Sequence, residues 1–445
     1  MSVIVRSQKN SKVERLVRIV LLQDFKGKLQ VIVRDNHLLD LKLLNSLTDR
    51  ELAPVHQTEI FELTRTRKLK QLDIAPGFFL LPTILEENVA SQPDCCFEIF
   101  ETDGVEIQQL ALDDLRAALH AADYRVSVVK CSVPDSLLKK RAPDNGSDLD
   151  EIFTSIKNFT TLRIKQRLEE TLEIPPLPQT ARRIIKLRAN PDAAVGELAE
   201  IVESDASLAA QVVSWASSPY YAAPGKIRSV QDAIVRILGF DLVSNLAVGM
   251  ALGSTISLPK DSVWGITPYW VQSVYCSTVV ESVVRQIPAN KRPSQGLACL
   301  AGLLHNFGYL VLAHTFPPHF STICRHVEAN PAISHVAIDH HLLGVTREQI
   351  SAWLMQLWNM PPEVSTALRF QHDADYNGEH SIYPHLIFIV MRLLRQHGIG
   401  DAPPEEIPLE LYQRHDLDPD KVREAVQRVV SSGEDIKQIA DNFHA

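Results

Sequence analysis

The stretch Leu297–Phe316, LACLAGLLHNFGYLVLAHTF, lies inside a segment that has no charged side chain between Arg292 and Arg325. Such a stretch is long enough to cross a bilayer as a helix. However, the polar pair His305-Asn306 falls near its middle, where polar side chains are costly in lipid. We therefore predict a helix that is buried in the core of a protein domain, with no membrane contact.

The sequence around this stretch shows one helix signal after another. Apolar residues recur three and four positions apart after Pro178, which indicates amphipathic helices. Residues typical of helix N-termini precede several of these runs: Asp205, Ser229 with Asp232, and Thr346 with Gln349. No segment of any length after Pro178 alternates with the period of a strand. We predict an all-α helical bundle over residues 173–445.

The first part of the chain predicts a mixed α/β domain over residues 1–130. Two apolar runs, Leu16–Leu22 and Leu29–Val33, flank a turn-forming segment and indicate a β-hairpin. A second hairpin is predicted from Cys96–Phe100 and Val105–Leu110, which flank a Thr-Asp-Gly turn. At about 150 residues per domain, a chain of 445 residues is expected to have two or three domains, and the change of pattern along this chain favours two.

Residues 131–172 are predicted to connect the two domains. Ser132–Ser147 carries prolines and an Asp-Asn-Gly-Ser tract, which is typical of a loop. Asp148–Leu172 then reads as an amphipathic helix whose apolar stripe is formed by Ile152, Ile156 and Phe159. A flexible tether would not need such a stripe. The stripe leaves two possibilities open: the helix docks between the domains and couples them, or it belongs to the helical domain's own core.

Composition limits the kinds of partner. The chain has 45 basic and 54 acidic side chains, a net charge of −9. General nucleic-acid binding is not expected, because it depends on clustered positive charge. The one dense basic run, Arg65–Lys70, either meets an RNA backbone or is a solvated face.

Cysteine usage and the N-terminus bear on location. The six cysteines include no C-x-x-C pair, which favours a reducing compartment. Met1–Asn10 lacks the apolar core of a signal peptide. We expect a cytoplasmic protein that has no contact with membranes.

Several short motifs in the helical part follow one another in a family order. They are Leu177-Pro178, Asp205–Leu208, Ser217–Tyr220, Ile227–Ile234, Ala301–Gly308, and Ala352–Leu354 with Trp358–Pro361. Together they resemble the HDOD domain, a relative of the HD metal-dependent phosphohydrolases. The resemblance covers about residues 173–400. It implies a regulatory domain of bacterial signal transduction.

Histidines are concentrated late in the chain, which raises the hypothesis of a metal site: thirteen of the sixteen lie at or after His305. An HD enzyme holds divalent ions with histidines and aspartates, and the ion activates water. In this chain the positions that match the family's ligands are Gln272, His305, Asn306, Arg347, Gln371 and His372. Asparagine offers only a neutral oxygen, and an arginine would repel a cation. We therefore expect no working metal centre and no cofactor. The remnant pocket around His305 either binds a small ligand or is filled by packed side chains.

The first domain resembles, over about residues 14–122, the YbaK-type aminoacyl-tRNA deacylases of the prolyl-tRNA editing family. The resemblance rests on the first hairpin, Ala75-Pro76-Gly77 with Pro82, and the late hairpin and helix. Those enzymes use a lysine on the first strand and a glycine-rich loop whose amides stabilise an oxyanion. Here Arg18 stands at the lysine position and Phe78–Leu81 fills the loop. The editing pocket of Arg18, Gly77 and Pro82 is therefore expected to be degenerate, because arginine does not replace lysine at such a site.

These observations predict a non-catalytic cytoplasmic signal-transduction protein in which an HDOD-type domain follows a degenerate editing-like domain. One alternative is an aminoacyl-tRNA deacylase that acts through the first domain and binds tRNA there. The other is a metal-dependent HD phosphohydrolase. The expected partner is a protein or a small-molecule signal that the sequence does not identify.

Overall fold

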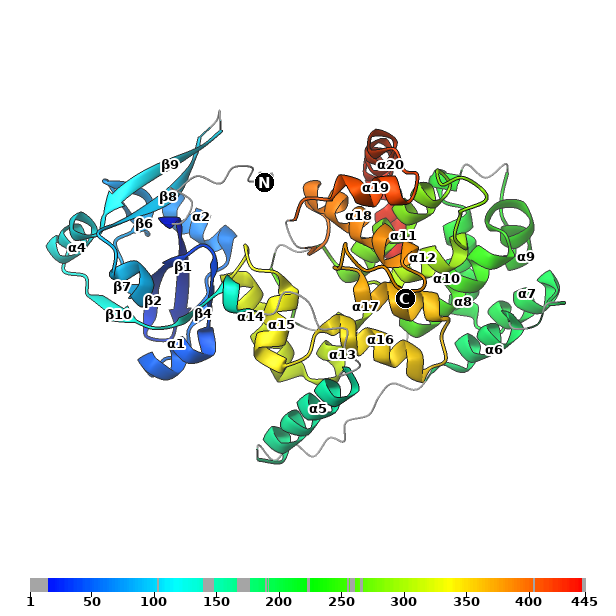
Figure 1. Cartoon of the computed structure of the whole chain (residues 1–445), viewed down its shortest axis with the longest axis horizontal. Coiled ribbons are helices and arrows are strands. Elements are labelled where there is room, and N and C mark those ends of the chain that lie inside the picture. The colour runs from blue at the N-terminus through cyan, green and yellow to red at the C-terminus, as the bar shows by residue number, and fades with distance from the viewer. Residues whose placement is uncertain are drawn as a thin grey trace.

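The computed structural model of the chain describes residues 15–101, 104–138, 148–165, 177–188, 190, 192–221, 225–253, 256, 261–264, 267–402 and 405–441. The chain forms an α/β unit and a larger helical unit (Figure 1). The two meet where helices α14 (Pro317–Ala329) and α15 (His335–Leu343), both yellow in Figure 1, face the blue α/β unit. The two-part architecture expected from the sequence is confirmed.

The α/β unit is organised around a five-stranded mixed sheet with the order β10-β7-β2-β1-β4. Its strands are β1 (Val17–Asp24), β2 (Gly27–Arg34), β4 (Ala53–Pro54), β7 (Thr83–Glu86) and β10 (Val126–Val129). β1 and β2 form the first predicted hairpin, in which Gly27 turns the chain with φ of 118°. β7 runs parallel to both β2 and β10. The apolar faces of this sheet form the core of the unit.

Three two-stranded pairs complete the unit. The second predicted hairpin is β8 (Asp94–Glu101) with β9 (Gly104–Ala111), and β5 (Gln71–Leu72) pairs with β6 (Ala75–Phe79). β3 (His37–Leu39) pairs with β11 (Ser132–Pro134), so the unit continues past the predicted boundary at residue 130. Its helices are α1 (Leu41–Thr48), α2 (Gln57–Arg65), α3 (Glu87–Ala90), α4 (Leu112–Ala121) and the 3₁₀ turn η2 (Asp135–Leu137).

Every regular element that the structure describes from Asp148 onward is helical, as predicted. The first ten helical elements are α5 (Asp148–Lys165), α6 (Gln179–Arg188), α7 (Val195–Glu203), α8 (Ala206–Ala216), η3 (Pro219–Tyr221), α9 (Val230–Ala233), η4 (Ile234–Leu238), α10 (Phe240–Gly253), α11 (Tyr269–Val284) and α12 (Gln295–Leu304). After them come α13 (Phe307–Thr315), α14, α15, α16 (Arg347–Leu357), α17 (Pro362–Phe370), α18 (Ile382–Gln396), α19 (Leu409–Arg414), α20 (Pro419–Ser431) and α21 (Gly433–Asp441).

The charge-free stretch lies in the core of the helical unit. Among the described residues, Gln295–Thr315 is the one segment with the length and hydropathy of a membrane span, and 94% of its 18-residue window is buried in the protein. The predicted core location is thus confirmed. The stretch is two helices, α12 and α13, because it breaks at His305–Asn306. A Cβ on Gly308 would lie 2.1 Å from the backbone oxygen of Arg347, so glycine allows α13 to approach α16 closely.

Helix α5 packs on the helical unit. Ile152 is buried, and Ser155 Oγ donates a hydrogen bond of 2.8 Å to Leu343 O. Asp148 accepts a hydrogen bond of 2.7 Å from Arg369 Nη2. The side chains of Ile156 and Phe159 lie outside the described residues, as does Leu172. The sequence left two possible locations open for this helix, between the domains or in the core of the helical unit. These contacts favour the core of the helical unit.

Candidate functional site

The break between α12 and α13 places His305 and Asn306 inside the helical unit. His305 is 2% exposed, and its Nδ1 lies 2.8 Å from Gly302 O. Burial lowers the pKa of this imidazole to about 4, so the ring is neutral near pH 7. Gln371 Nε2 donates to His305 O over 2.7 Å. Asn306 Nδ2 donates to Asp401 Oδ2 over 3.4 Å.

Arg347 is the most strongly engaged member of the predicted set. It is the first residue of α16, whose N-terminus is closed by a capping box of Thr346 and Gln349. Its guanidinium makes a two-bond pair with Asp339, Nε to Oδ2 at 2.7 Å and Nη2 to Oδ1 at 3.2 Å. Nη1 lies 3.1 Å from Asp401 Oδ2. Burial lowers the pKa of the Arg347 guanidinium, but these carboxylates outweigh that effect and hold it above its usual value.

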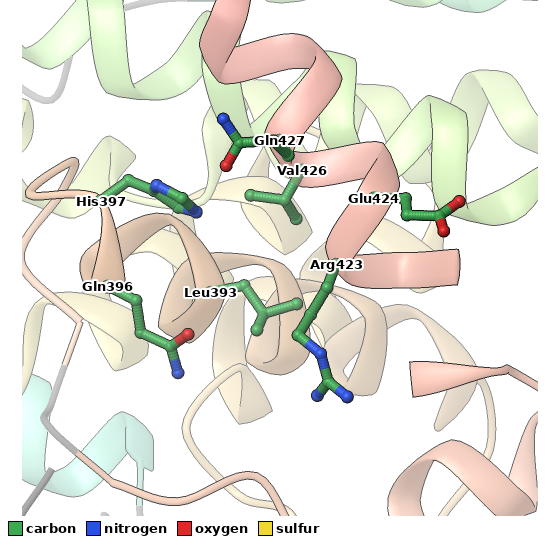
Figure 2. A pocket seen from close by; sticks show the side chains of 7 residues that line it. All are labelled: Leu393, Gln396, His397, Arg423, Glu424, Val426 and Gln427. Carbon is green, nitrogen blue, oxygen red and sulfur yellow. The ribbon is translucent and has the colours of Figure 1, made fainter. Parts of the chain in front are cut away.

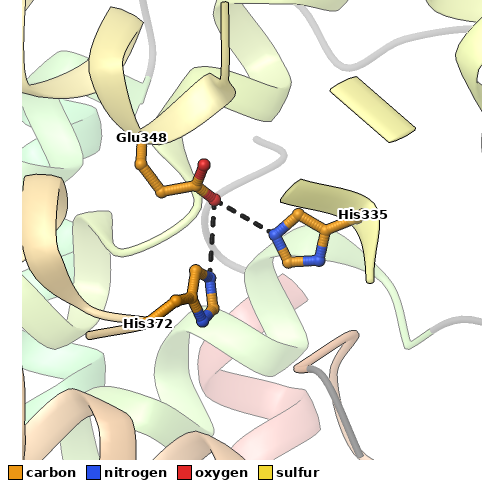
Figure 3. Close-up of side chains that lie close together, drawn as sticks. All are labelled: His335, Glu348 and His372. Atoms are coloured by element: carbon orange, nitrogen blue, oxygen red, sulfur yellow. Dashed lines mark hydrogen bonds and ion pairs between the residues drawn. The ribbon is translucent and has the colours of Figure 1, made fainter. Parts of the chain in front are cut away.

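His335, Glu348 and His372 form a cluster (Figure 3), and Glu348 directly follows Arg347 in α16. Both imidazoles approach the same carboxylate oxygen: His335 Nε2 lies 3.0 Å and His372 Nε2 lies 3.4 Å from Glu348 Oε1. The two rings meet edge to face, with centroids 5.0 Å apart. Burial would raise the pKa of Glu348, but the two histidines hold it well below its usual value.

The structure thus brings most of the predicted remnant pocket together. His305, Asn306, Arg347, Gln371 and His372 are linked by the contacts above, through Asp401 and Glu348. Gln272 lies nearby on α11, since its Oε1 would be 3.5 Å from a Cβ on Gly400.

Sequence reasoning missed His335, Glu348 and Asp401. The late histidine cluster was the only signal for His335. Glu348 directly follows a predicted position, but neither its type nor its spacing matched the family pattern.

The family positions do not fit a phosphohydrolase metal centre. At Arg347, where the resemblance leads one to expect a ligand, the side chain is a cation that is paired with two carboxylates. The amide nitrogens of Asn306 and Gln371 donate hydrogen bonds to protein oxygens, so each side chain has only one neutral oxygen left. We derive no hydrolytic step through a metal at these positions.

Arg18 lies at the junction between the two units. Burial lowers the pKa of its guanidinium to about 10. Its hydrogen bonds go to Arg34 O, Asp35 O, His37 O, Ala329 O and Asn330 Oδ1, at 2.9, 2.9, 2.9, 3.3 and 2.6 Å. The last two acceptors belong to the helical unit. Arg18 therefore joins the two units instead of facing a substrate.

The other predicted editing residues are elsewhere. Pro82 O accepts a hydrogen bond of 3.0 Å from Gln30 N, whereas Arg18 pairs with Val33 farther along β2. Gly77 lies on β6 with φ of 95°. Within the described part of the chain, the Arg18 side chain makes its hydrogen bonds to other residues, and none of them is to Gly77 or Pro82. Phe78, expected to crowd the loop, is fully buried against Phe97, with ring centroids 4.9 Å apart.

A separate cavity of about 360 Å³ lies between α18 and α20 (Figure 2). It is lined by Leu393, Gln396, His397, Arg423, Glu424, Val426 and Gln427. No residue of the predicted site lines it, so it is distinct from the cluster around His305.

The chain is similar to a known domain family and to solved structures of other proteins. The model of the HDOD domain matches residues 174–374, the part that contains the cluster. The crystal structure of a protein from Marinobacter aquaeolei VT8, provisionally described as a signal transduction protein, is 41% identical. The match covers 99% of this chain and 96% of the Marinobacter chain, with a TM-score of 0.85. Residues 174–374 of this chain are an HDOD domain.

One more distant solved structure shares the fold of the HDOD part, and one more distant relative matches in sequence. An HDOD domain protein of unknown function from Geobacter sulfurreducens covers 65% of this chain and 99% of its own, at 20% identity and a TM-score of 0.50. An "Uncharacterized protein" from Treponema pallidum (strain Nichols) is 23% identical over 241 residues. That match covers 54% of this chain and 45% of the Treponema protein, so the chain spans less than half of that relative's length.

Proposed function

We propose that this HDOD protein is a non-catalytic regulator in cytoplasmic signal transduction. The observation that carries the proposal is the pairing of the buried Arg347 guanidinium with Asp339 and Asp401. The family resemblance would place a metal ligand at this position. The description of the Marinobacter relative supports a signalling role. The six buried free cysteines are compatible with a reducing compartment.

The contacts between the units support a mechanism in which the two act together. Leu38 of the α/β unit packs with Ile333, Ala337 and Ile338 of the helical unit in one buried apolar cluster. His341 Nε2 on α15 lies 2.9 Å from Asp40 Oδ2, and Asp40 caps α1. A protein partner or small-molecule signal that shifts α15 would therefore reach the α/β unit without a shared active site.

Two measurements test the proposal: an assay of the purified chain for phosphohydrolase activity, and a test of variant chains in the organism that encodes it. The purified chain is assayed with phosphate monoesters and diesters in the presence of Mn²⁺, and no turnover is expected. In the organism that encodes it, a chain with His305→Gln should still supply the gene's function, whereas a chain with a disrupted junction should not. Turnover that is abolished by His305→Gln would favour the phosphohydrolase alternative.

We further propose that the α/β unit is a degenerate aminoacyl-tRNA editing domain. The order of its hairpins and loop supports the likeness, and the engagement of Arg18 at the junction supports the loss of activity. Mischarged prolyl-tRNA should not be deacylated, and Arg18→Lys should not restore activity. Residual tRNA binding would use the exposed basic side chains of Arg65–Lys70 and would weaken with salt. Robust deacylation by the wild-type chain would contradict this proposal.

A further inference from the structure

Arg392 is a cation inside the helical unit whose carboxylate partner lies at the surface. It belongs to α18, and its side chain is 1% exposed, whereas the side chain of Glu405 is 49% exposed. Arg392 Nη2 donates to Glu405 Oε2 over 2.6 Å. Nη1 donates to Phe388 O over 3.3 Å, and the guanidinium lies over the Phe388 ring. Burial lowers the pKa of the Arg392 guanidinium, and Glu405 opposes that effect.

The pairing with Glu405 uses only half of one edge of the guanidinium. Nε and Nη2 form the edge on which an arginine can bind both oxygens of a carboxylate. Three other arginines of this chain use both atoms for one carboxylate: Arg50 with Asp24, Arg347 with Asp339, and Arg369 with Asp148. In Arg392, Nη2 is paired but Nε is buried without a hydrogen-bond acceptor. Because such a buried donor is costly, this edge favours a ligand with two acceptor oxygens.

Glu405 can leave Arg392 without freeing the segment that directly follows α18. Arg395 Nη1 donates to Gly400 O over 2.8 Å, and Ala402 is buried. These residues stay in place when the half-exposed carboxylate of Glu405 turns into water. The Arg392 cation cannot follow it, because it is held inside the protein by its helix. A buried charge that loses its partner is costly, so the guanidinium then needs another anion.

We infer that the Nε and Nη2 edge of Arg392 is a binding site for the carboxylate or phosphate group of a small ligand, and that Glu405 occupies this edge as an internal competitor. Either group can present two oxygens to the two N–H donors. The ligand and Glu405 exclude each other, because both bind Nη2. Replacement of Glu405 by the ligand keeps the buried cation paired and gives Nε–H an acceptor. The inference stands independently of the signalling role.

The test measures the melting temperature of the full-length chain at increasing concentrations of sodium phosphate or sodium acetate, with sodium chloride to keep the ionic strength constant. An anion that binds the folded chain raises the melting temperature as its concentration rises. Glu405→Gln removes the internal competitor. Its apparent dissociation constant for the anion should be at least about 10-fold lower than that of the wild type, as expected if Glu405 leaves the edge free for about one-tenth of the time. The anion with the larger gain identifies the ligand group.

Glu406→Gln is the matched control, because Glu406 is the exposed neighbour of Glu405. It should respond as the wild type does, including the general stabilisation that phosphate gives to any folded protein. Adding Arg392→Lys to Glu405→Gln should remove most of the gain, since lysine keeps the charge but lacks the planar edge.

Equal responses of Glu405→Gln and Glu406→Gln would mean that the chain binds adventitious ions only, and they would overturn the inference. This comparison decides the matter even when the double variant does not fold. A gain that survives in full with Arg392→Lys also overturns the inference. So does a Glu405→Gln chain that is unfolded in chloride and stays unfolded in phosphate and in acetate, because the freed edge then has no affinity for an external anion.

Discussion

Replacement of Asn330 by alanine should uncouple the two units. Asn330 is fully buried at the end of α14. Its Oδ1 accepts from Arg18 Nη2 and from Leu39 N, both at 2.6 Å. Its Nδ2 donates to Leu39 O at 3.0 Å and to His326 O at 2.7 Å. One amide therefore satisfies two backbone groups and one guanidinium of the α/β unit.

The size of the effect follows from the groups that lose a partner. A buried polar group left without a hydrogen bond costs about 1–3 kcal/mol. Asn330→Ala removes the partner of both Leu39 N and Leu39 O, whereas Arg18 keeps its other hydrogen bonds. The free energy that holds the units together should fall by roughly 2–6 kcal/mol, taking about 1–3 kcal/mol for each of the two groups.

Scanning calorimetry and small-angle X-ray scattering would measure this change. We expect the unfolding transitions of the two units to separate and the radius of gyration to rise, while each unit stays folded. Gln356→Ala is the matched control, because it truncates an exposed amide on α16. If Asn330→Ala and Gln356→Ala give the same melting curve and scattering profile, the junction does not depend on this amide and the reasoning fails.

Three further substitutions test other parts of the fold. Ile152→Asp should destabilise the helical unit by about 3 kcal/mol without changing the distance between the units, because α5 packs on α16; scattering that shows separated units would contradict this. Gly308→Ala should cost about 1–3 kcal/mol in chemical denaturation, since its Cβ would overlap Arg347 O. Arg347→Met should cost about 3–5 kcal/mol by leaving Asp339 and Asp401 buried without their cation; a neutral result would show that the carboxylates are not charged.

The α/β unit shows how far local patterns predict structure. The two hairpins followed from apolar runs on either side of turn residues, and both are present in the predicted segments. β11 was missed because it is three residues long and is stabilised only by pairing with β3. A strand of this kind has no pattern of its own, so its partner decides that it forms.

The candidate site shows how far residues matched to a family by position predict the contacts in the structure. These positions predicted which residues gather around His305, and the structure brings five of them into one network. They also assigned Arg18 to a substrate pocket, but its guanidinium instead bonds to oxygens on both sides of the junction. One of these partners, Asn330, lies 312 positions away in the chain, so no local pattern around Arg18 indicates it.

The sequence by itself determined the two-unit division, the helical character of the second unit and the burial of Leu297–Phe316. These features depend on periodicity, turn chemistry and the cost of exposing apolar surface, all of which are present within single segments. Only the tertiary structure decided that His335, Glu348 and His372 meet, and that Asn330 bridges the units. Those contacts join separate helices and strands whose relative positions follow from packing of the whole core, so no local spacing encodes them.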